Sequence, residues 1–354
     1  MKKKSLFAGF LALVMCISMM SVTAFAAEST DDTGNTITIS TPAQLIDLSD
    51  YSNGSGEVRD YPRNFSGWKV VIANDINMTG YTWQPIANFN GDMQGSIKED
   101  GTTTTISYLN VTASEKAGLC ANTANGTFSN LTIANSSFTN TNKSSGAYAG
   151  AFAANGFTSD FLNCDVKNTT IEGVRFVGGV TGYSYGNITD CDVTDCIVKT
   201  NANIFGQIAG YGDNIGGIVG ILCEGHSTIS NCHVKDTDVS GLRQVGGIAG
   251  AVMYGNTIKA CSVYGGSVVA TGNNRSEGAT ACAGGIVGQL ASQAAGEANA
   301  ITITGNKVGA NVNISGKVAG WAVGDATSRA VSGSICTISN TFDGENPTLL
   351  EIGA

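Results

Sequence analysis

The sequence predicts an all-β protein that folds as a parallel β-helix (a β-solenoid) with a short capping helix at its N-terminal end. The chain contains 47 Gly, 4 Pro, 42% hydrophobic residues and only 13% charged residues. This composition is too apolar for a disordered chain and too poor in Leu, Lys and Glu for a helical one. A glycine-rich hexapeptide recurs along the chain, and the apolar residues after each copy keep the spacing of short strands joined at corners.

The first 26 residues are expected to be a signal peptide. Residues 2–4 are all Lys, residues 6–20 carry no charge, and small residues precede a cleavage position after Ala26. The apolar run is short for a transmembrane helix. A lipoprotein signal at Cys16 is disfavoured because the residue before it is too bulky. We therefore expect export, and a secreted or extracellular mature form that does not span a membrane.

Residues 27–40 are expected to form a linker, and residues 41–116 the N-terminal cap and first coils. Thr41 suits the N-cap of a helix and Pro42 its first position, while Leu45 and Leu48 would share one face. The end of a β-helix exposes unpaired backbone and core side chains. A short helix at this point would cover them.

Residues 117–342 contain the repeats, and residues 343–354 are expected to be a C-terminal tail. The hexapeptide IGGIVG of residues 215–220 has further copies that begin at Ala117, Ala149, Val177, Val245, Ala283 and Ala319. Equivalent residues are unevenly spaced, which predicts loops at residues 201–213, 270–281 and 289–298. We expect one continuous solenoid from about Trp68 to Phe342. We favour a right-handed one because its coils are longer than the turns of hexapeptide solenoids.

After the hexapeptide, in five of the copies, inward-facing residues follow at intervals of three, two and five. In the copy with the clearest pattern these residues are Ile229, Cys232, Val234 and Val239. An interval of two is strand periodicity, whereas intervals of three and five require bends for all four side chains to point inward. Asn and Asp tolerate the left-handed conformation of such bends, and Asn231 and Asp236 occupy them here. A propeller blade needs roughly 40–50 residues, and most of these copies are shorter. A β-sandwich would not require this repetition.

Four cysteines occupy the same inward position in consecutive copies: Cys164, Cys191, Cys232 and Cys261. Free cysteine behaves as a small buried apolar residue. Coils of a β-helix lie about 4.8 Å apart, whereas the Cβ atoms of a disulfide lie about 3.8 Å apart. We therefore expect reduced thiols.

The sequence gives little support to an active site. Only two His occur, neither beside a recognisable nucleophile motif, and no helix follows the glycine motif as in a phosphate loop. The cysteine spacings are not those of zinc sites, and no calcium-loop motif occurs. No metal and no cofactor are therefore expected. A net charge of −9 with scattered cations argues against nucleic acid as a partner.

One set of outward side chains remains a candidate catalytic site. The position between the Cys and Val columns should bring Asp165, Asp192 and His233 onto successive coils. The two aspartates would be about 5 Å apart at the backbone, near the carboxyl separation of retaining glycosidases. The plainer interpretation is a solvated face, because the composition supplies no groove of aromatic residues.

Residues 216–241 resemble the GLUG repeat of bacterial secreted and surface proteins, a repeat associated with adhesin-like and IgA-peptidase architectures. The resemblance extends over residues 117–341 and weakens at Asn306 and Thr341. Residues 74–95 resemble a module that often precedes such repeats. The resemblance implies a β-solenoid displayed outside the cell, and it implies no reaction.

Two functions of different class are consistent with these observations. The favoured one is an exported, non-catalytic surface, adhesion or binding protein, expected as a monomer, whose partner is a host or cell-surface glycan or protein. The alternative is a β-helix carbohydrate-active enzyme, a polysaccharide lyase or glycosidase, that uses Asp165, Asp192 and His233.

Overall fold

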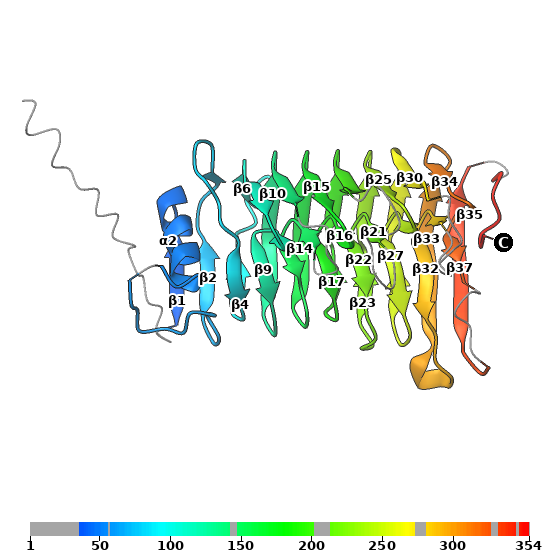
Figure 1. Cartoon of the computed structure of the whole chain (residues 1–354), viewed down its shortest axis with the longest axis horizontal. Helices are drawn as coiled ribbons and strands as arrows, with labels where there is room; N and C mark the ends of the chain where they lie inside the picture. The colour runs from blue at the N-terminus through cyan, green and yellow to red at the C-terminus, as the bar shows by residue number, and fades with distance from the viewer. Residues whose placement is uncertain are drawn as a thin grey trace, which may run out of the picture.

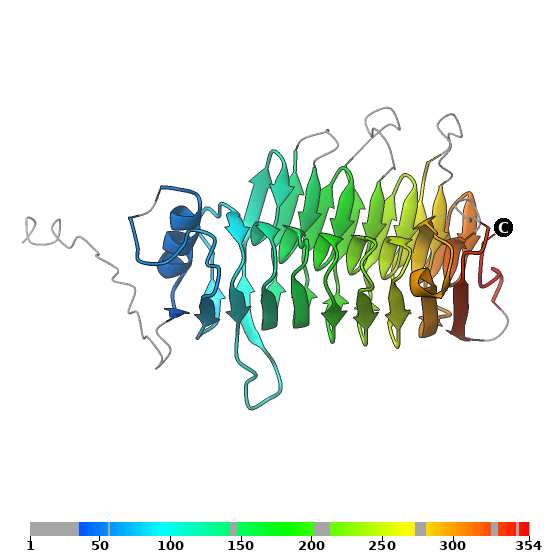
Figure 2. The same ribbon diagram turned by 90° about the horizontal axis from the view of Figure 1, so that it is seen from below.

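The strands of the protein stack as successive coils along one long axis (Figures 1 and 2). The structure is a computed structural model and describes residues 35–55, 57–141, 147–201, 213–272, 281–326, 332–344 and 347–353. Within these residues all strand pairings between named strands are parallel, and the strands form four sheets of 15, 7, 7 and 8 strands. The predicted parallel β-helix is therefore confirmed.

The four sheets run along the length of the solenoid. Sheet one contains β1 (Thr36–Ile39), β2 (Lys69–Ile72), β3 (Ile76–Asn77), β5 (Asp92–Gln94), β6 (Thr104–Ser107), β10 (Thr127–Ala134), β14 (Asp160–Lys167), β18 (Ile188–Thr189), β19 (Asp192–Thr194), β23 (Thr228–Ser230), β24 (His233–Lys235), β28 (Thr257–Lys259), β29 (Ser262–Tyr264), β33 (Ile301–Gly309) and β37 (Cys336–Asp343). Sheet two contains β7 (Asn110–Ala113), β11 (Ser137–Asn140), β15 (Thr170–Gly173), β20 (Ile197–Thr200), β25 (Asp238–Gly241), β30 (Ser267–Ala270) and β34 (Asn313–Ser315).

The other two sheets carry the hexapeptide motif. Sheet three contains β8 (Lys116–Ala117), β12 (Tyr148–Gly150), β16 (Phe176–Gly178), β21 (Asn214–Gly216), β26 (Gln244–Gly246), β31 (Cys282–Gly284) and β35 (Val318–Gly320). Sheet four contains β4 (Ile86–Phe89), β9 (Cys120–Thr123), β13 (Ala153–Asn155), β17 (Thr181–Ser184), β22 (Val219–Leu222), β27 (Ala249–Met253), β32 (Val287–Ser292) and β36 (Val323–Asp325).

The predicted inward columns form the core. Ile229, Cys232, Val234 and Val239 are all buried and belong to one continuous apolar cluster. The bends between them lie at the predicted positions, because Asn231 has a φ of 52° and Asp236 a φ of 47°. The same left-handed conformation recurs at the equivalent residues of other coils: Asn130, Asn163, Asp190, Ala260 and Gly305 at the first bend, and Asn135, Asn168 and Asp195 at the second.

Ala260 is the residue least suited to its bend. Its φ is 55°, and this conformation costs an L-residue other than Asn or Asp roughly 1–2 kcal/mol. We expect Ala260→Asn to raise the free energy of unfolding by about 1 kcal/mol, because Asn tolerates this conformation. Denaturant titration measures the change. Ala298→Asn is the matched control at an exposed position without a positive φ, and an equal effect of the two changes would contradict the explanation.

The N-terminal helix forms as predicted, but it does not begin the solenoid. In α2 (Pro42–Ser52), the Thr41 hydroxyl accepts the Gln44 backbone N–H, and the Gln44 side chain accepts the Thr41 N–H in return. Leu45 and Leu48 are buried, and α2 lies at one end of the stack (Figure 1). However, β1 precedes the helix and pairs with β2. The expected linker of residues 27–40 and the expected start near Trp68 are therefore corrected: the described sheet begins at Thr36.

Two further expectations about segments outside the strands need correction. Residues 347–353, expected in a tail, extend the last coil: the Trp321 N–H donates to the Leu350 carbonyl (2.8 Å), and Ile352 bridges Val323 in parallel. The expected loop at residues 289–298 begins inside β32 and ends in a short 3₁₀ helix, η2 (Glu297–Asn299). Most of the other two expected loops, residues 202–212 and 273–280, lies outside the described residues.

The helices that the structure describes are all too short or too polar to cross a bilayer.

The cysteine column lies in the core, as predicted. Cys164, Cys191, Cys232 and Cys261 are at most 1% exposed. Their sulfur atoms make hydrogen bonds to backbone: the Cys191 thiol donates to the Thr189 carbonyl (3.3 Å), and its sulfur accepts the Cys164 N–H (3.4 Å). Burial raises the pKa of Cys191 and Cys232 well above the ordinary value, and the hydrogen bond with Cys232, together with burial, does the same for the pKa of Cys261. These three thiols are therefore protonated and poorly nucleophilic.

We expect the column cysteines to resist alkylation in the folded protein. Iodoacetamide should label Cys336 first, because it is only half-buried, and should reach Cys164, Cys191, Cys232 and Cys261 only after unfolding. Mass spectrometry after alkylation under native and then denaturing, non-reducing conditions measures both reactivity and linkage. Recovery of a Cys191–Cys232 linked peptide would contradict this prediction.

Candidate functional site

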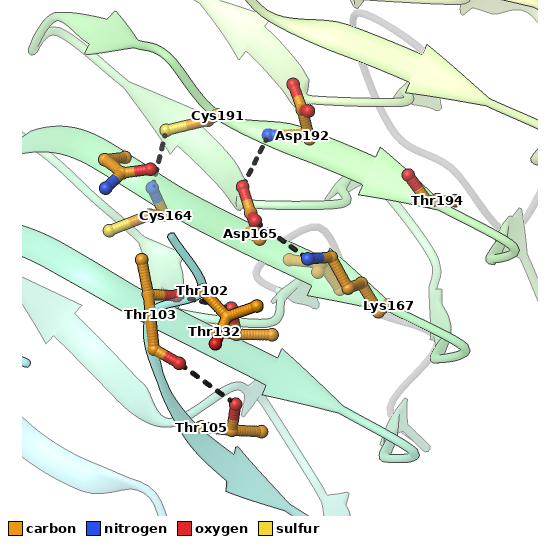
Figure 3. A network of polar contacts seen from close by, with 12 residues as sticks. Thr102, Thr103, Thr105, Thr132, Cys164, Asp165, Lys167, Cys191, Asp192 and Thr194 are labelled. Carbon is orange, nitrogen blue, oxygen red and sulfur yellow. Dashed lines mark hydrogen bonds and ion pairs between the residues drawn. The ribbon is translucent and has the colours of Figure 1, made fainter. Parts of the chain in front are cut away.

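The predicted outward-facing residues Asp165, Asp192 and His233 lie on neighbouring strands. Asp165 lies on β14, Asp192 on β19 and His233 on β24, and these strands are adjacent in sheet one. Asp192 is directly opposite His233 in the strand register. Figure 3 shows the two aspartates side by side, with Lys167 next to Asp165. The sequence therefore placed these three side chains correctly with respect to one another.

The side chains of this column form hydrogen bonds and an ion pair mainly with residues of the same and neighbouring coils. The Asp165 carboxylate accepts the Asp192 backbone N–H (3.2 Å) and pairs with Lys167 (3.1 Å). The Asp192 carboxylate in turn accepts the His233 N–H (3.2 Å), and His233 Nδ1 shares a hydrogen bond of 2.6 Å with Ser262 Oγ. Burial and the nearby Asp165 charge raise the pKa of Asp192. These contacts join successive coils, as structural hydrogen bonds do.

A different feature is the crease at which sheet three meets sheet four in successive coils. Along this crease the second position of every hexapeptide copy is a glycine: Gly118, Gly150, Gly178, Gly216, Gly246, Gly284 and Gly320. A Cβ at Gly216 would lie 2.0 Å from the Val219 carbonyl oxygen and 2.7 Å from the Gly250 nitrogen. At this crease, which we call the glycine crease, the backbone of sheet three therefore lies close to the backbone of sheet four. The side chains of the two sheets flank the crease.

Aromatic residues line a cavity of about 490 Å³ in the crease. Tyr148 and Phe176 come from sheet three and are paired in register, while Tyr183 and Tyr185 come from sheet four and the turn after it. The remaining lining residues are Arg175, Ile221, Cys223, Glu224, Met253, Ala291, Ser292 and Gln293. The composition did not point to this aromatic cavity, and neither Asp165 nor Asp192 lines it.

The aromatic rings form one connected group. The Tyr148 ring lies 4.8 Å from Phe176 and is stacked at 6.0 Å on Tyr183, between ring centroids. Tyr183 contacts Tyr185 edge-on at 5.5 Å, and their hydroxyls are 3.2 Å apart. The Arg175 guanidinium lies 4.7 Å from the Phe176 ring centroid, within the range of a cation–π contact.

The side chains that line the cavity carry no net formal charge. Burial raises the pKa of both Tyr148 and Tyr183 and raises that of Cys223 to about 12, so all three stay protonated at neutral pH. Glu224 and Arg175 give the lining one formal negative and one formal positive charge. The cavity therefore presents hydroxyl donors and ring faces rather than a net charge. Among the described residues, no group of three His, Cys, Asp or Glu side chains could hold a metal ion.

Sequence reasoning missed this cavity because its aromatics lie outside the inward columns. Tyr148 and Phe176 each stand one residue before a hexapeptide copy, and the same position holds Asn214 and Gln244 in later coils. The group is confined to a few coils, so it leaves no repeating signal. The available clue was that aromatic residues flank two consecutive copies at the same offset.

Comparisons with known proteins support the fold alone. No family model matches the chain, and no curated protein matches it. The resemblance to the GLUG repeat therefore stays a prediction. A crystal structure from Bacteroides ovatus, described as a putative immunoglobulin A1 protease, is similar with a TM-score of 0.58 and 18% sequence identity, and the match covers 88% of this chain and 85% of that one. At this identity the likeness shows a common β-helical architecture.

Proposed function

We propose that this protein is an exported, non-catalytic binding protein that holds a neutral glycan in the aromatic cavity of the glycine crease. The observation that carries the proposal is the group of Tyr148, Phe176, Tyr183 and Tyr185 around one cavity. A pyranose ring has an apolar C–H face and a rim of hydroxyls. Aromatic faces, which carry partial negative charge, suit the former, and Arg175, Glu224 and Gln293 suit the latter.

A glycan array with the purified mature chain tests this proposal directly. We expect binding to neutral glycans, and we expect Tyr185→Ala to weaken it at least tenfold, a loss of about 1.4 kcal/mol. Tyr185 is only partly buried, so the change should leave the fold intact, which circular dichroism verifies. Tyr81→Ala removes an exposed tyrosine that does not line the cavity and should bind like the parent. Equal binding by all three proteins would refute the assignment of the site.

Export is the second part of the proposal and has its own test. It is supported by the basic and apolar segments of the first 26 residues. Expression in a bacterial host should yield protein outside the cytoplasm that begins at Ala27, as N-terminal sequencing would show. Intracellular protein with an intact N-terminus would contradict export. It would not bear on the proposed glycan binding.

A carbohydrate-active enzyme is the alternative, favoured by one observation: the raised pKa of Asp192 beside Asp165 suits a general acid paired with a carboxylate. Degradation of a polysaccharide that is abolished by Asp165→Asn or Asp192→Asn would establish it. The hydrogen bonds of both carboxylates to neighbouring coils predict the opposite result, in which these changes affect stability and the protein degrades nothing.

A further inference from the structure

A second cavity, of about 580 Å³, lies near the capped end of the solenoid. Its wall includes residues of β4, β8 and β9 together with the segment before β4 and residues 112–115. The polar lining is rich in side-chain amides, from Asn53, Gln84, Asn88 and Asn122. Lys116 and Glu115 add one positive and one negative charge, so this cavity, like the aromatic one, has no net formal charge.

Paired strands of neighbouring coils connect the linings of the two cavities. Lys116 of the second cavity is paired in register with Tyr148 of the aromatic cavity, through β8 and β12. Asn122 is paired with Asn155, which is in turn paired with Tyr183. The Asn155 amide also donates to Asn122 Oδ1 (3.4 Å). A single coil, which carries Tyr148 and Asn155, therefore joins the lining of one cavity to that of the other.

Trp83 provides an independent sign of a ligand in the second cavity. Trp83 is 4% exposed and lines the cavity, yet its indole N–H has no hydrogen-bond partner among the residues that the structure describes. A buried donor without an acceptor costs about 1–3 kcal/mol, and such a group in a native structure calls for an explanation. A ligand oxygen in the cavity would supply the missing acceptor.

We propose that the glycine crease is one continuous cleft that binds a linear, neutral polysaccharide along the solenoid axis, with Trp83 as a hydrogen-bond donor at one end. This inference rests on the proposed function and deepens it. From β4 to β32 the cleft spans six coil steps, or about 29 Å at the ~4.8 Å spacing of paired strands. A monosaccharide cannot fill that length, whereas an extended chain can contact amides at one end and aromatic rings at the other.

Affinity as a function of chain length tests the continuous cleft. The probes are cello-, xylo- and manno-oligosaccharides from disaccharide to octasaccharide, titrated by calorimetry, with oligogalacturonides as the acidic comparison. We expect affinity for a neutral series to rise with length until the chain spans both cavities. Trp83→Phe keeps the ring and removes the N–H, and it should weaken the longest chains about three- to tenfold while leaving the disaccharide unchanged.

Two other variants separate the cavities. Tyr185→Ala should weaken short and long chains alike, because both occupy the aromatic cavity. Trp321→Phe removes an indole N–H near the other end of the solenoid, outside the lining of either cavity, and should bind every chain like the parent.

Each result distinguishes this inference from the proposed function. Neutral chains that bind equally at all lengths, with no effect of Trp83→Phe, would overturn the continuous cleft and leave the aromatic site standing. No binding of any neutral series would overturn both proposals. Preference for oligogalacturonides over every neutral series would overturn the neutral ligand in each.

Discussion

Val234→Asp is expected to destabilise the protein by several kcal/mol, more than the same change at Val308. Val234 is 1% exposed and lies mid-stack, paired with Val193 on one side and Val263 on the other. The introduced carboxyl would have no water and no cationic partner in this apolar column, so the charged form is strongly disfavoured. Solenoid stability is approximately a sum of coil and interface terms, and a defect in the middle weakens interfaces that many coils depend on.

Val308 offers the comparison near the end of the same column. It is also buried, but its outer neighbour Phe342 is only partly covered, and few coils lie beyond it. Thermal melts should therefore show the larger drop in midpoint for Val234→Asp. Lys259→Asp places the same carboxyl on an exposed strand position and should change stability by no more than about 0.5 kcal/mol. Equal drops at Val234 and Val308 would mean that stability does not depend on position in the stack.

The pH dependence of this variant provides a second measurement. Burial raises the folded-state pKa of the introduced carboxyl above its unfolded value of about 3.9. The folded state then holds the proton longer than the unfolded state, so stability falls as pH rises above about 4. The deficit of Val234→Asp relative to the parent should accordingly be smaller at pH 4 than at pH 7.

The core could be predicted from the sequence because its constraints repeat in every coil. The position of Cys232 holds a buried cysteine in four consecutive coils, and a bend such as Asn231 must tolerate a positive φ. These requirements leave periodic traces. The register of Asp165, Asp192 and His233 followed from the same periodicity, since fixing the inward residues fixes the outward ones between them.

The ends and the cleft could not be predicted in the same way. Strand β1 and the Ile352 bridge cover the first and last coils, where nothing repeats. The cleft depends on individual residues: Tyr183 comes from one coil, and Trp83 lies before the first hexapeptide copy. A site built from single occurrences leaves no periodic signal, and only the folded register brings its parts together.

Gly216→Ala is expected to have the second large effect, and its neighbour Gly217 supplies the comparison. Both are glycines of the hexapeptide, but they differ across copies. The position of Gly216 is glycine in all seven copies, whereas the position of Gly217 is Ala151 in an earlier coil. The Cβ of Gly216→Ala would meet only backbone atoms, at 2.0 to 2.8 Å on its own coil and the next. No side chain can move aside, so the two sheets would have to separate along the crease.

We therefore expect Gly216→Ala to cost about 3 kcal/mol, the upper end of the range for overpacked sites, and to widen the cleft. A Cβ at Gly217 would also lie 2.0 Å from a backbone oxygen, the Gly247 carbonyl. Gly217→Ala should still cost less, because the coil that carries Ala151 shows that the backbone can adjust to a methyl group at this position. Denaturant titration of both variants measures the difference. If the two changes lower the free energy of unfolding equally, the close approach of the two sheets at Gly216 would not explain why this position is glycine in every copy. Since that approach hollows the crease, Gly216→Ala should also weaken glycan binding in the fraction that remains folded.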